Sequence, residues 1–368
     1  MLNIKKTPEK LAQNHDKFWA KAQLILLASM IFSFPRLVKE LLNPLSENDY
    51  PVLNTRLFVK CWLSYAMDKS LTSMRDLFKR LNNTGFSVDI STFSKANMHR
   101  SQEPFIQIYQ KLYELVNKKG LRKQRDNYLI CPIDSTTITL TSKLLWAQGY
   151  HQVKLFSSLN LSQGMPEESL INFGYDHDYN YGKEMIDSLP QNGVGVMDRG
   201  FAGLDYIKKV SECQKYFVLR ISNNWKLKFD DDTGLTRVGT GGKAGVYRVI
   251  NFCDLETKTE YRLVTNLPQE GEMAVTDEEV MEIYRYRWGI ELLWKFLKMH
   301  LKLDKLITKN VNGIAIQIYA TLIAYLILQL IEIPQQWGQK LLDKLRYLQA
   351  CMCQEISYVH WMTKLTKC

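Results

Sequence analysis

The chain has 368 residues, with 48 Lys and Arg against 38 Asp and Glu, which gives a formal net charge of +10. With 46% hydrophobic residues, 10 Pro and 19 Gly, the composition excludes a disordered, collagen-like or low-complexity chain, and the length suits two to three domains. The seven Cys are scattered without a C-x-x-C pair, which argues against a zinc finger or a disulfide scaffold and favours reduced thiols in a cytosol.

Positive charge is concentrated at the front of the chain. Residues 1–130 carry a net +10, residues 131–200 carry −4, residues 201–300 are neutral, and residues 301–368 carry +4. A basic N-terminal region followed by an acidic central region is typical of a nucleic-acid-binding surface beside a cation-binding centre. A solvated basic surface would give the same balance, so charge alone leaves both interpretations open.

The front of the chain is predicted to be helical. The helical prediction covers residues 9–125, and apolar residues recur at spacings of three and four over 58–67 and 105–116. Within this stretch, the run Asn-Asn-Thr-Gly at 82–85 separates two helices predicted over 71–81 and 91–100.

The second of these helices has the composition of a DNA-contacting element. Ser91 is placed to cap it. Lys95, Asn97 and Arg100 are the DNA-binding candidates on it, because their side chains suit phosphates and base edges. The alternative is an ordinary helical pair with a polar outer face.

From residue 128 onward the pattern changes to short apolar strands. The strands are predicted over 128–134, 135–140, 152–161, 192–198 and 215–221. A strand- and turn-rich stretch follows, and helical periodicity returns from Asp277 to Lys298. The uncharged run 314–331 is long enough to span a membrane but stands alone in a charged chain, so a buried core helix is expected.

Two carboxylates end predicted strands, Asp134 and Asp198. Strand ends in an α/β sheet border one crevice, where rigid backbones aim side chains at a common point. A single Asp at such a place is usually a cap or turn residue. A pair therefore favours a functional site but does not establish one.

A third carboxylate, Glu291, lies on the predicted helix after residue 277. At about 100° per residue, Tyr284, Arg287, Glu291 and Lys298 fall on one narrow stripe. The opposite arc is apolar and contains Leu292, Leu293, Phe296 and Met299. The pattern predicts a mostly buried helix with one polar stripe. An internal salt bridge between Arg287 and Glu291, four residues apart, is the alternative.

The spacing Tyr-x2-Arg-x3-Glu-x6-Lys at these four positions resembles the signature of DDE-type insertion-sequence transposases, insertion sequence family 4. Asp-Arg-Gly-Phe at 198–201 is similar to that family's second motif, and Ile-Asp-Ser-Thr at 133–136 to its first. Gly-Met-Pro at 164–166 and His-Asp at 177–178 also match positions where the family has similar residues. The resemblance covers roughly residues 70–330, and none of these motifs is broken.

The resemblance implies a ribonuclease-H-like α/β fold, a mixed sheet flanked by helices and interrupted by a β-rich insertion, with an all-helical N-terminal domain. The implied domains are a DNA-binding domain at 1–125, a catalytic domain at 126–335 and a helical tail at 336–368 that could serve dimerisation. The insertion is expected at about 222–272. The 93 residues between the second and third carboxylates leave room for it, against 64 between the first and second.

The resemblance also implies an activity, a DNA transposase that cuts at the ends of its element and joins them to target DNA, by cut-and-paste through a hairpin. Asp134, Asp198 and Glu291 would be catalytic and would hold Mg²⁺ or Mn²⁺, with two ions expected, since these ions take oxygen ligands. Positive charge on the stripe of Glu291 would hold end phosphates. The DNA-binding candidates there are Arg287 and Lys298, with Tyr284 as a hydroxyl donor.

The implied partners are double-stranded DNA, as terminal inverted repeats and target, and a second copy of the chain in a homodimer. No membrane is expected, and the implied location is the bacterial cytoplasm, at the nucleoid. A hairpin would be eased by an extruded base resting on an aromatic ring, and Tyr261 is favoured over Trp225 for this role. An aromatic packed in the core of the insertion is the alternative.

Two other functions remain open from the sequence. One is a domesticated metal-dependent DNA nuclease, which would use the same carboxylates. The other is a DNA-binding repressor of the element without catalysis, which the intact set of three carboxylates argues against.

Overall fold

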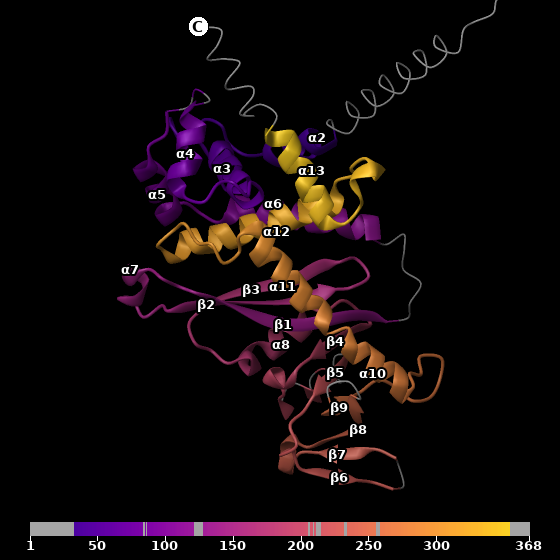
Figure 1. Cartoon of the computed structure of the whole chain (residues 1–368). Helices are drawn as coiled ribbons and strands as arrows, with labels where there is room; N and C mark the ends of the chain where they lie inside the picture. Colours follow the sequence, from indigo (N-terminus) through magenta and orange to yellow (C-terminus); the bar gives the residue numbers. More distant parts are fainter. Residues whose placement is uncertain are drawn as a thin grey trace, which may run out of the picture. The chain divides into compact units, whose positions relative to one another are not determined.

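The computed structural model describes residues 33–353 except 84, 86, 121–127, 205–206, 209, 211–214, 232–233 and 255–257. The helical segment predicted before residue 33 and the tail after residue 353 lie outside this range. The chain divides into two compact units (Figure 1). One contains residues 1–95, 101–112 and 319–368, and the other contains residues 96–100 and 113–318. These units are defined by contacts alone, so the functional domain limits given above stay a prediction.

The first unit is helical. Its elements are α2 (Ser33–Leu42), α3 (Thr55–Met67), α4 (Met74–Asn83) and α13 (Leu341–Cys353), with parts of α5 (Ile90–His99), α6 (Glu103–Gly120) and α12 (Val311–Leu330). Helix α3 begins at the N-cap Asn54, whose side chain accepts a hydrogen bond from the N–H of Leu57. The rings of Phe58, Trp62, Phe78 and Phe93 pack with centroids 4.9–5.4 Å apart. The helical front predicted from apolar spacing is confirmed over the described residues.

The second unit contains one nine-stranded mixed sheet in the order β3-β2-β1-β4-β5-β9-β8-β7-β6. The strands are β1 (Leu129–Thr139), β2 (Gln152–Asn160), β3 (Met165–Phe173), β4 (Gly193–Met197), β5 (Tyr216–Arg220), β6 (Leu227–Phe229), β7 (Thr236–Val238), β8 (Gly245–Asp254) and β9 (Thr259–Thr265). β1, β4 and β5 are parallel neighbours, and all other pairs are antiparallel. The predicted mixed sheet flanked by helices is confirmed, and the β-rich insertion extends this sheet at β6–β9.

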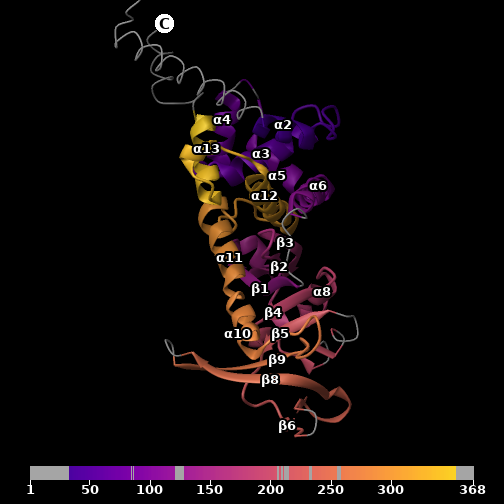
Figure 2. The ribbon, with the colours of Figure 1, turned by 90° about the vertical axis from the view of Figure 1, so that its right-hand side faces the viewer.

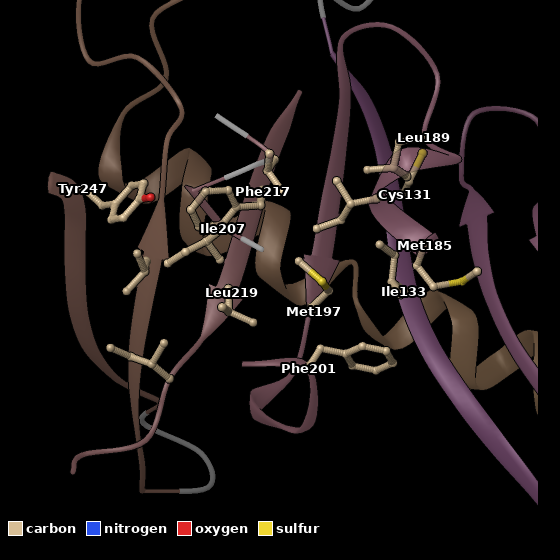
Figure 3. Packing of buried hydrophobic residues seen from close by; sticks show 14 of the residues in the cluster. Cys131, Ile133, Met185, Leu189, Met197, Phe201, Ile207, Phe217, Leu219 and Tyr247 are labelled. Carbon is tan, nitrogen blue, oxygen red and sulfur yellow. The ribbon is translucent and has the colours of Figure 1, made fainter. Parts of the chain in front are cut away.

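Helices cover both faces of the central strands. α10 (Asp277–Arg285) and α11 (Trp288–Leu301) lie along one face, and α8 (Gly182–Asp187) lies along the other (Figure 2). Because side chains alternate along a strand, each strand contributes to both layers. The α8 layer contains Cys131, Ile133, Met185, Leu189, Met197, Phe217 and Leu219 (Figure 3). The α10 layer contains Val194, Val196, Val218, Leu263, Val280 and Ile283.

Several elements differ from the sequence prediction. The two strands predicted over 128–140 form one continuous strand, β1. The strand β3 was not predicted, because Pro166 and the acidic residues after it interrupt its apolar pattern. The single helix predicted from Asp277 to Lys298 is two helices, because α10 ends at Arg285 and α11 starts at Trp288.

The uncharged run forms α12, the one helix in the described ranges that is long and apolar enough to cross a membrane. Its most apolar stretch is 83% buried within the protein. This is the burial expected of the core helix predicted from the sequence.

Candidate active site

Asp134 lies in the middle of β1, and not at a strand end as predicted. It is opposite Ser157 of β2. β4 pairs with β1 only from Leu129 to Pro132, and β1 continues for seven residues beyond that pairing. Among the described strands, none continues the pairing on that side of β1. The second half of β1, which contains Asp134, therefore continues past the end of this pairing, on the side where the loop after β4 begins.

Asp198 follows β4 directly, as predicted. It caps the short helix η2 (Arg199–Phe201), and its Oδ1 accepts a hydrogen bond from the N–H of Gly200 at 2.7 Å. A Cβ at Gly200 would lie 3.0 Å from that same Oδ1. The glycine of the Asp-Arg-Gly motif is therefore explained by space, because any side chain there would crowd the carboxylate that the motif carries.

Glu291 is in the first turn of α11, where its carboxylate forms an ion pair with Arg287 at 2.7 Å. The Arg287 and Glu291 side chains are 18% and 33% exposed. The salt bridge weighed as the alternative interpretation is thus present. It is partly buried, and the charges of both its residues act on the carboxyl group of Asp134.

The electrostatics of Asp134 link it to the other two carboxylates. Its pKa is raised from 3.8 to about 7, first by burial, and further by the charges of Asp198 and Glu291. The backbone N–H of Ser135 and the guanidinium of Arg287 act in the opposite direction. A buried acid with two acids and a single arginine in its field is short of positive charge.

This arrangement fits a divalent cation, which would supply the missing charge with oxygen ligands. Among the described residues, no group of three or more His, Cys, Asp or Glu side chains already converges as a metal site. Two of the carboxylates hold other partners, Asp198 the N–H of Gly200 and Glu291 the side chain of Arg287. These contacts use one oxygen of each carboxylate, Oδ1 of Asp198 and Oε1 of Glu291.

The polar stripe of the predicted helix is only partly as expected. Lys298 donates a hydrogen bond to the carbonyl of Thr137 in β1, at 3.1 Å. The arc opposite Glu291 is only partly buried, because Leu293 is buried while Leu292 and Met299 are 56% and 58% exposed. The buried residues of α11 are Ile290, Leu293, Trp294, Leu297 and Leu301. They lie roughly a quarter turn from Glu291, so this carboxylate stands at the edge of the packed face.

Tyr284, at the end of α10, is buried, and its burial raises the pKa of its hydroxyl. The charges of Arg287 and Arg220 lower this pKa, and that of Asp198 raises it. Tyr284 therefore lies beside the carboxylates, although the helix containing it ends before the one containing Glu291. Sequence reasoning missed Arg220, whose signal is its place at the carboxyl end of the parallel strand β5.

Tyr261 lies in β9 within an aromatic cluster. Its ring is stacked on Phe252 of β8, with centroids 5.0 Å apart and planes 9° apart, and meets Tyr284 edge-on at 5.8 Å. The guanidinium of Arg220 lies 4.3 Å from the ring centroid. Tyr261 is thus joined to the site through Tyr284. Trp225, the other aromatic considered, packs against the α8 layer.

The predicted DNA-contacting helix corresponds to α5, with one correction. Lys95 is exposed and Arg100 is half-buried, but Asn97 is fully buried. A buried Asn97 cannot reach a base edge from this conformation. The start of the helix also differs, because Asp89 and not Ser91 supplies the side-chain acceptor, taking a hydrogen bond from the N–H of Ser91 at 2.6 Å.

Comparison with known proteins agrees with this geometry. The family profile described as transposase DDE domain matches residues 125–327. A protein of Synechocystis sp. assigned as a transposase for insertion sequence element IS4SA is 52% identical over 340 residues, 91% of this chain and 99% of that protein. A Geobacillus stearothermophilus protein assigned as a transposase for insertion sequence element IS5377 is 24% identical over 65% of this chain and 66% of its own.

A solved structure of the piggyBac transposase synaptic complex with hairpin DNA aligns with 89% of this chain and 77% of that chain, at 10% identity and a TM-score of 0.42. Similarity at that level supports no conclusion about this chain. The profile covers more than half of the residues, and the first relative covers nearly the whole length. The chain therefore belongs to the DDE transposases, the enzymes that cleave DNA and transfer its strands, as the transposase of an insertion sequence.

Proposed function

We propose that Asp134, Asp198 and Glu291 are the catalytic carboxylates of this transposase. The observation that carries the proposal is the pKa of Asp134, which burial raises to about 7 with further contributions from the charges of the other two acids. A buried acid whose pKa is raised by neighbouring acids is found at functional sites more often than elsewhere. The three also occupy the positions of the family's three motifs.

The family depends on divalent metal ions, and we propose Mg²⁺ or Mn²⁺ here, with two ions in the active complex. Such ions activate a water or 3′-hydroxyl and stabilise the leaving oxygen of a phosphodiester. The protein's own part is to hold the acids ready. β1 holds Asp134, the end of β4 positions Asp198, and Arg287 holds Glu291 through their ion pair.

We propose that positive side chains around the carboxylates hold the DNA ends. Arg287 is within reach of the cleaved phosphate because it pairs with Glu291, and Lys298 follows on the same helix. Tyr284 supplies a hydroxyl beside Asp198. Lys95 on α5 and Arg100 just after this helix would add contacts to the DNA backbone, as expected from the basic front of the chain.

The DNA partners in this proposal are the terminal inverted repeats of the element and its target. Because each element has two ends, we propose a homodimer in which each subunit cuts one end. The name of the Synechocystis relative, a transposase for an insertion sequence element, supports a bacterial element. The location that follows is the cytoplasm, at the nucleoid.

The test is cleavage of end DNA with Mg²⁺ by the variants Asp134→Asn, Asp198→Asn and Glu291→Gln. Each should lower the rate by at least about 10³-fold and leave DNA affinity within a few-fold, because each loses a metal-binding charge but keeps its shape. Glu282→Gln, an exposed acid on α10, is the matched control and should cleave normally. Normal cleavage by any of the three variants would remove that residue from the proposed set.

We further propose that cleavage proceeds through a hairpin, with Tyr261 supporting an extruded base. Tyr261→Ala should nick the end normally but form hairpins roughly 10-fold more slowly, given about 1–3 kcal/mol for stacking. A substrate lacking the extruded base should restore hairpin formation. Phe252→Ala is the matched control, because it removes the packing partner of Tyr261 from the same cluster. If the two variants lose nicking and hairpin formation alike, Tyr261 serves only to pack β9.

A further inference from the structure

We propose that Asp178 is a positioning residue that joins the strand carrying Asp134 to the loop carrying Asp198. This inference rests on the proposed catalytic set, but the contacts that carry it lie outside that set. Asp178 begins the short helix η1 (Asp178–Tyr181), which leads into α8 on the opposite face of the sheet from α11.

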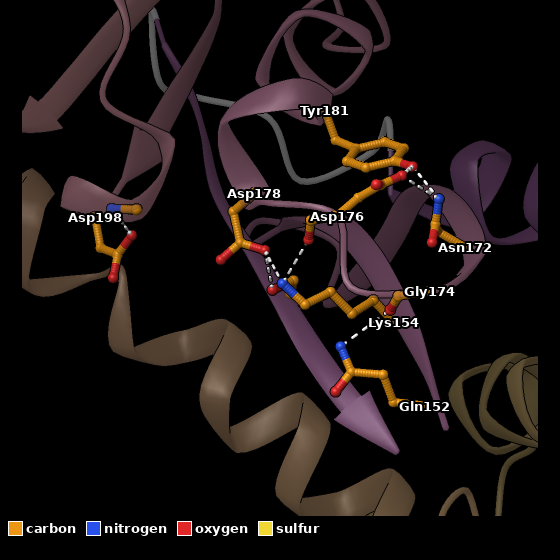
Figure 4. A network of polar contacts seen from close by, with 10 residues as sticks. Gln152, Lys154, Asn172, Gly174, Asp176, Asp178, Tyr181 and Asp198 are labelled. Atoms are coloured by element: carbon orange, nitrogen blue, oxygen red, sulfur yellow. Dashed lines mark hydrogen bonds and ion pairs between the residues drawn. The ribbon is translucent and has the colours of Figure 1, made fainter. Parts of the chain in front are cut away.

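One oxygen of Asp178 is held by two strands. Its Oδ1 accepts a hydrogen bond from the hydroxyl of Ser135 at 2.9 Å and from the ammonium of Lys154 at 3.1 Å (Figure 4). Ser135 is the residue after Asp134 in β1, and Lys154 lies on β2. Lys154 also donates to the carbonyl of Asp176, at 2.9 Å, which fixes the loop in front of η1.

The other oxygen of Asp178 faces the loop after β4. A Cβ placed on Gly200 would lie 3.4 Å from Asp178 Oδ2 and 3.0 Å from Asp198 Oδ1. Both carboxylates therefore lie close to the space beside Gly200, and Figure 4 shows Asp178 between Lys154 and Asp198. Gly200 is the residue whose N–H binds Asp198.

These contacts explain how Asp134, on a strand, and Asp198, in a loop, are held at a fixed distance from each other. Beyond Pro132, β4 does not extend along β1, so backbone pairing does not fix the loop of Asp198 against Asp134. Asp178 accepts a hydrogen bond from Ser135 on one side and lies close to Gly200 on the other. A catalytic group misplaced by about 1 Å can reduce the rate about 100-fold. A residue that keeps Asp134 and Asp198 in position therefore affects catalysis directly.

The charge state of the network favours positioning over metal binding. The Lys154 and Asp178 side chains are 16% and 26% exposed, and their ion pair neutralises the acid. With a cation and a hydroxyl on Oδ1, Asp178 has less charge to offer a metal than Asp198, whose Oδ1 accepts from a neutral backbone N–H. The carboxylate is held as a support for its neighbours.

The experiment compares Asp178→Ala with Asp178→Asn in Mg²⁺-dependent end cleavage by the full chain. Loss of the acceptor in Asp178→Ala should lower the maximal rate about 10–100-fold, with unchanged DNA affinity. Asp178→Asn keeps an oxygen for Ser135 and Lys154 and should recover most of that rate. Ser135→Ala should have a smaller effect that is not additive with Asp178→Ala, because both break one contact.

Asp176→Ala is the matched control. Asp176 is in the same loop and accepts hydrogen bonds from Asn172 and Tyr181 at 2.9 and 2.8 Å, but not from Ser135. Its loss should affect thermal unfolding as much as that of Asp178 and leave cleavage near normal. Equal cleavage by the two alanine variants would overturn the proposal.

Asp178→Asn as inactive as Asp134→Asn would also overturn the proposal, because it would make the charge itself essential, as for a metal ligand. Failure of the proposed function is distinguishable from both outcomes. In that case Asp134→Asn itself would remain active, whatever the Asp178 variants do.

Discussion

The inner and outer parts of the same sheet differ in how they are covered. Every residue of β4 is buried, and so is the centre of β5. β6 is largely exposed, with Phe229 60% exposed, and Val246 at the start of β8 is 54% exposed. Inner strands have helices on both faces and read as apolar runs, which is the usual pattern of parallel strands.

This difference in coverage coincides with the position of the catalytic candidates. Asp134 and Asp198 come from β1 and from the end of β4, which are held in the doubly covered part. The outer strands contribute one candidate, Tyr261 of β9, the strand that pairs with β5 of the inner part. We therefore expect side chains of the inner part to control both stability and chemistry, and those of the outer strands to tolerate change.

The largest expected effect compares two phenylalanines. Phe217→Ala in β5 removes a ring that is fully buried in the α8 layer and should lower the free energy of unfolding by about 3–5 kcal/mol. Phe229→Ala in β6 should change it by less than about 0.5 kcal/mol, because that ring is mostly in solvent. Chemical denaturation of both variants measures the contrast. Similar losses would show that the outer strands are packed as tightly as the inner ones.

The next effect concerns pH and Asp134. Since the pKa of this acid rises from 3.8 to about 7 on folding, the folded state holds a proton that the unfolded state releases. Its contribution to stability is therefore full below pH 4, falls between pH 4 and pH 7, and is lost above pH 7. Asp134→Asn should be more stable than the unaltered protein at pH 8 by on the order of 2 kcal/mol, and equal to it at pH 4.

Thermal unfolding at several pH values, without added metal, tests this. Added Mg²⁺ should reduce the gap at pH 8, because a cation that binds only the folded acid stabilises it. A gap that does not vary with pH would mean that the acid is not buried among like charges.

The smallest expected effect concerns the link between the outer strand β8 and α10. Arg248 is 5% exposed, and its guanidinium donates to the Asp277 carboxylate at 2.7 Å and to the Val275 carbonyl at 2.6 Å. Asp277→Asn should cost about 1 kcal/mol, a small value because the Asp277 side chain is 53% exposed. Glu278→Gln, the adjacent exposed acid, is the control. An equal loss in both variants would assign the effect to the helix terminus and not to Arg248.

Much of this fold could be predicted because local pattern and burial agree in the inner strands. β2, β4 and β5 fall within two residues of their predicted limits, since their apolar runs are bounded by turn residues. β7 was missed, because three residues are too few for a period. The break between α10 and α11 contains no Gly or Pro at Tyr286 or Arg287 that would have indicated it.

The site was less accessible to sequence reasoning than its residue types suggest. The three carboxylates could be named from their motifs. The prediction that Asp134 ends a strand was wrong, because the alternating Thr and Ile residues after it continue the same strand, and the sequence does not show where the neighbouring β4 ends. The burial of Asn97 depends on its packing, which a helical stripe cannot specify. Asp178 could not be linked to Ser135 from spacing, because they lie 43 residues apart on different elements.

The strand order also has a consequence for how the chain folds. β6, β7, β8 and β9 are consecutive antiparallel neighbours, so each hairpin closes over a short loop. By contrast, Cys131 meets Gly195 across 64 residues, and Val218 meets Thr265 across 47. Closing a long loop has an entropic cost that grows with its length, and non-local pairing slows folding. If the meander of β6–β9 forms first, the loop that remains to be closed between β5 and β9 is effectively shorter. The exposed strands would then bring the helix of Glu291 back to the sheet, and the contact between the two aspartate-bearing strands would be among the last to form.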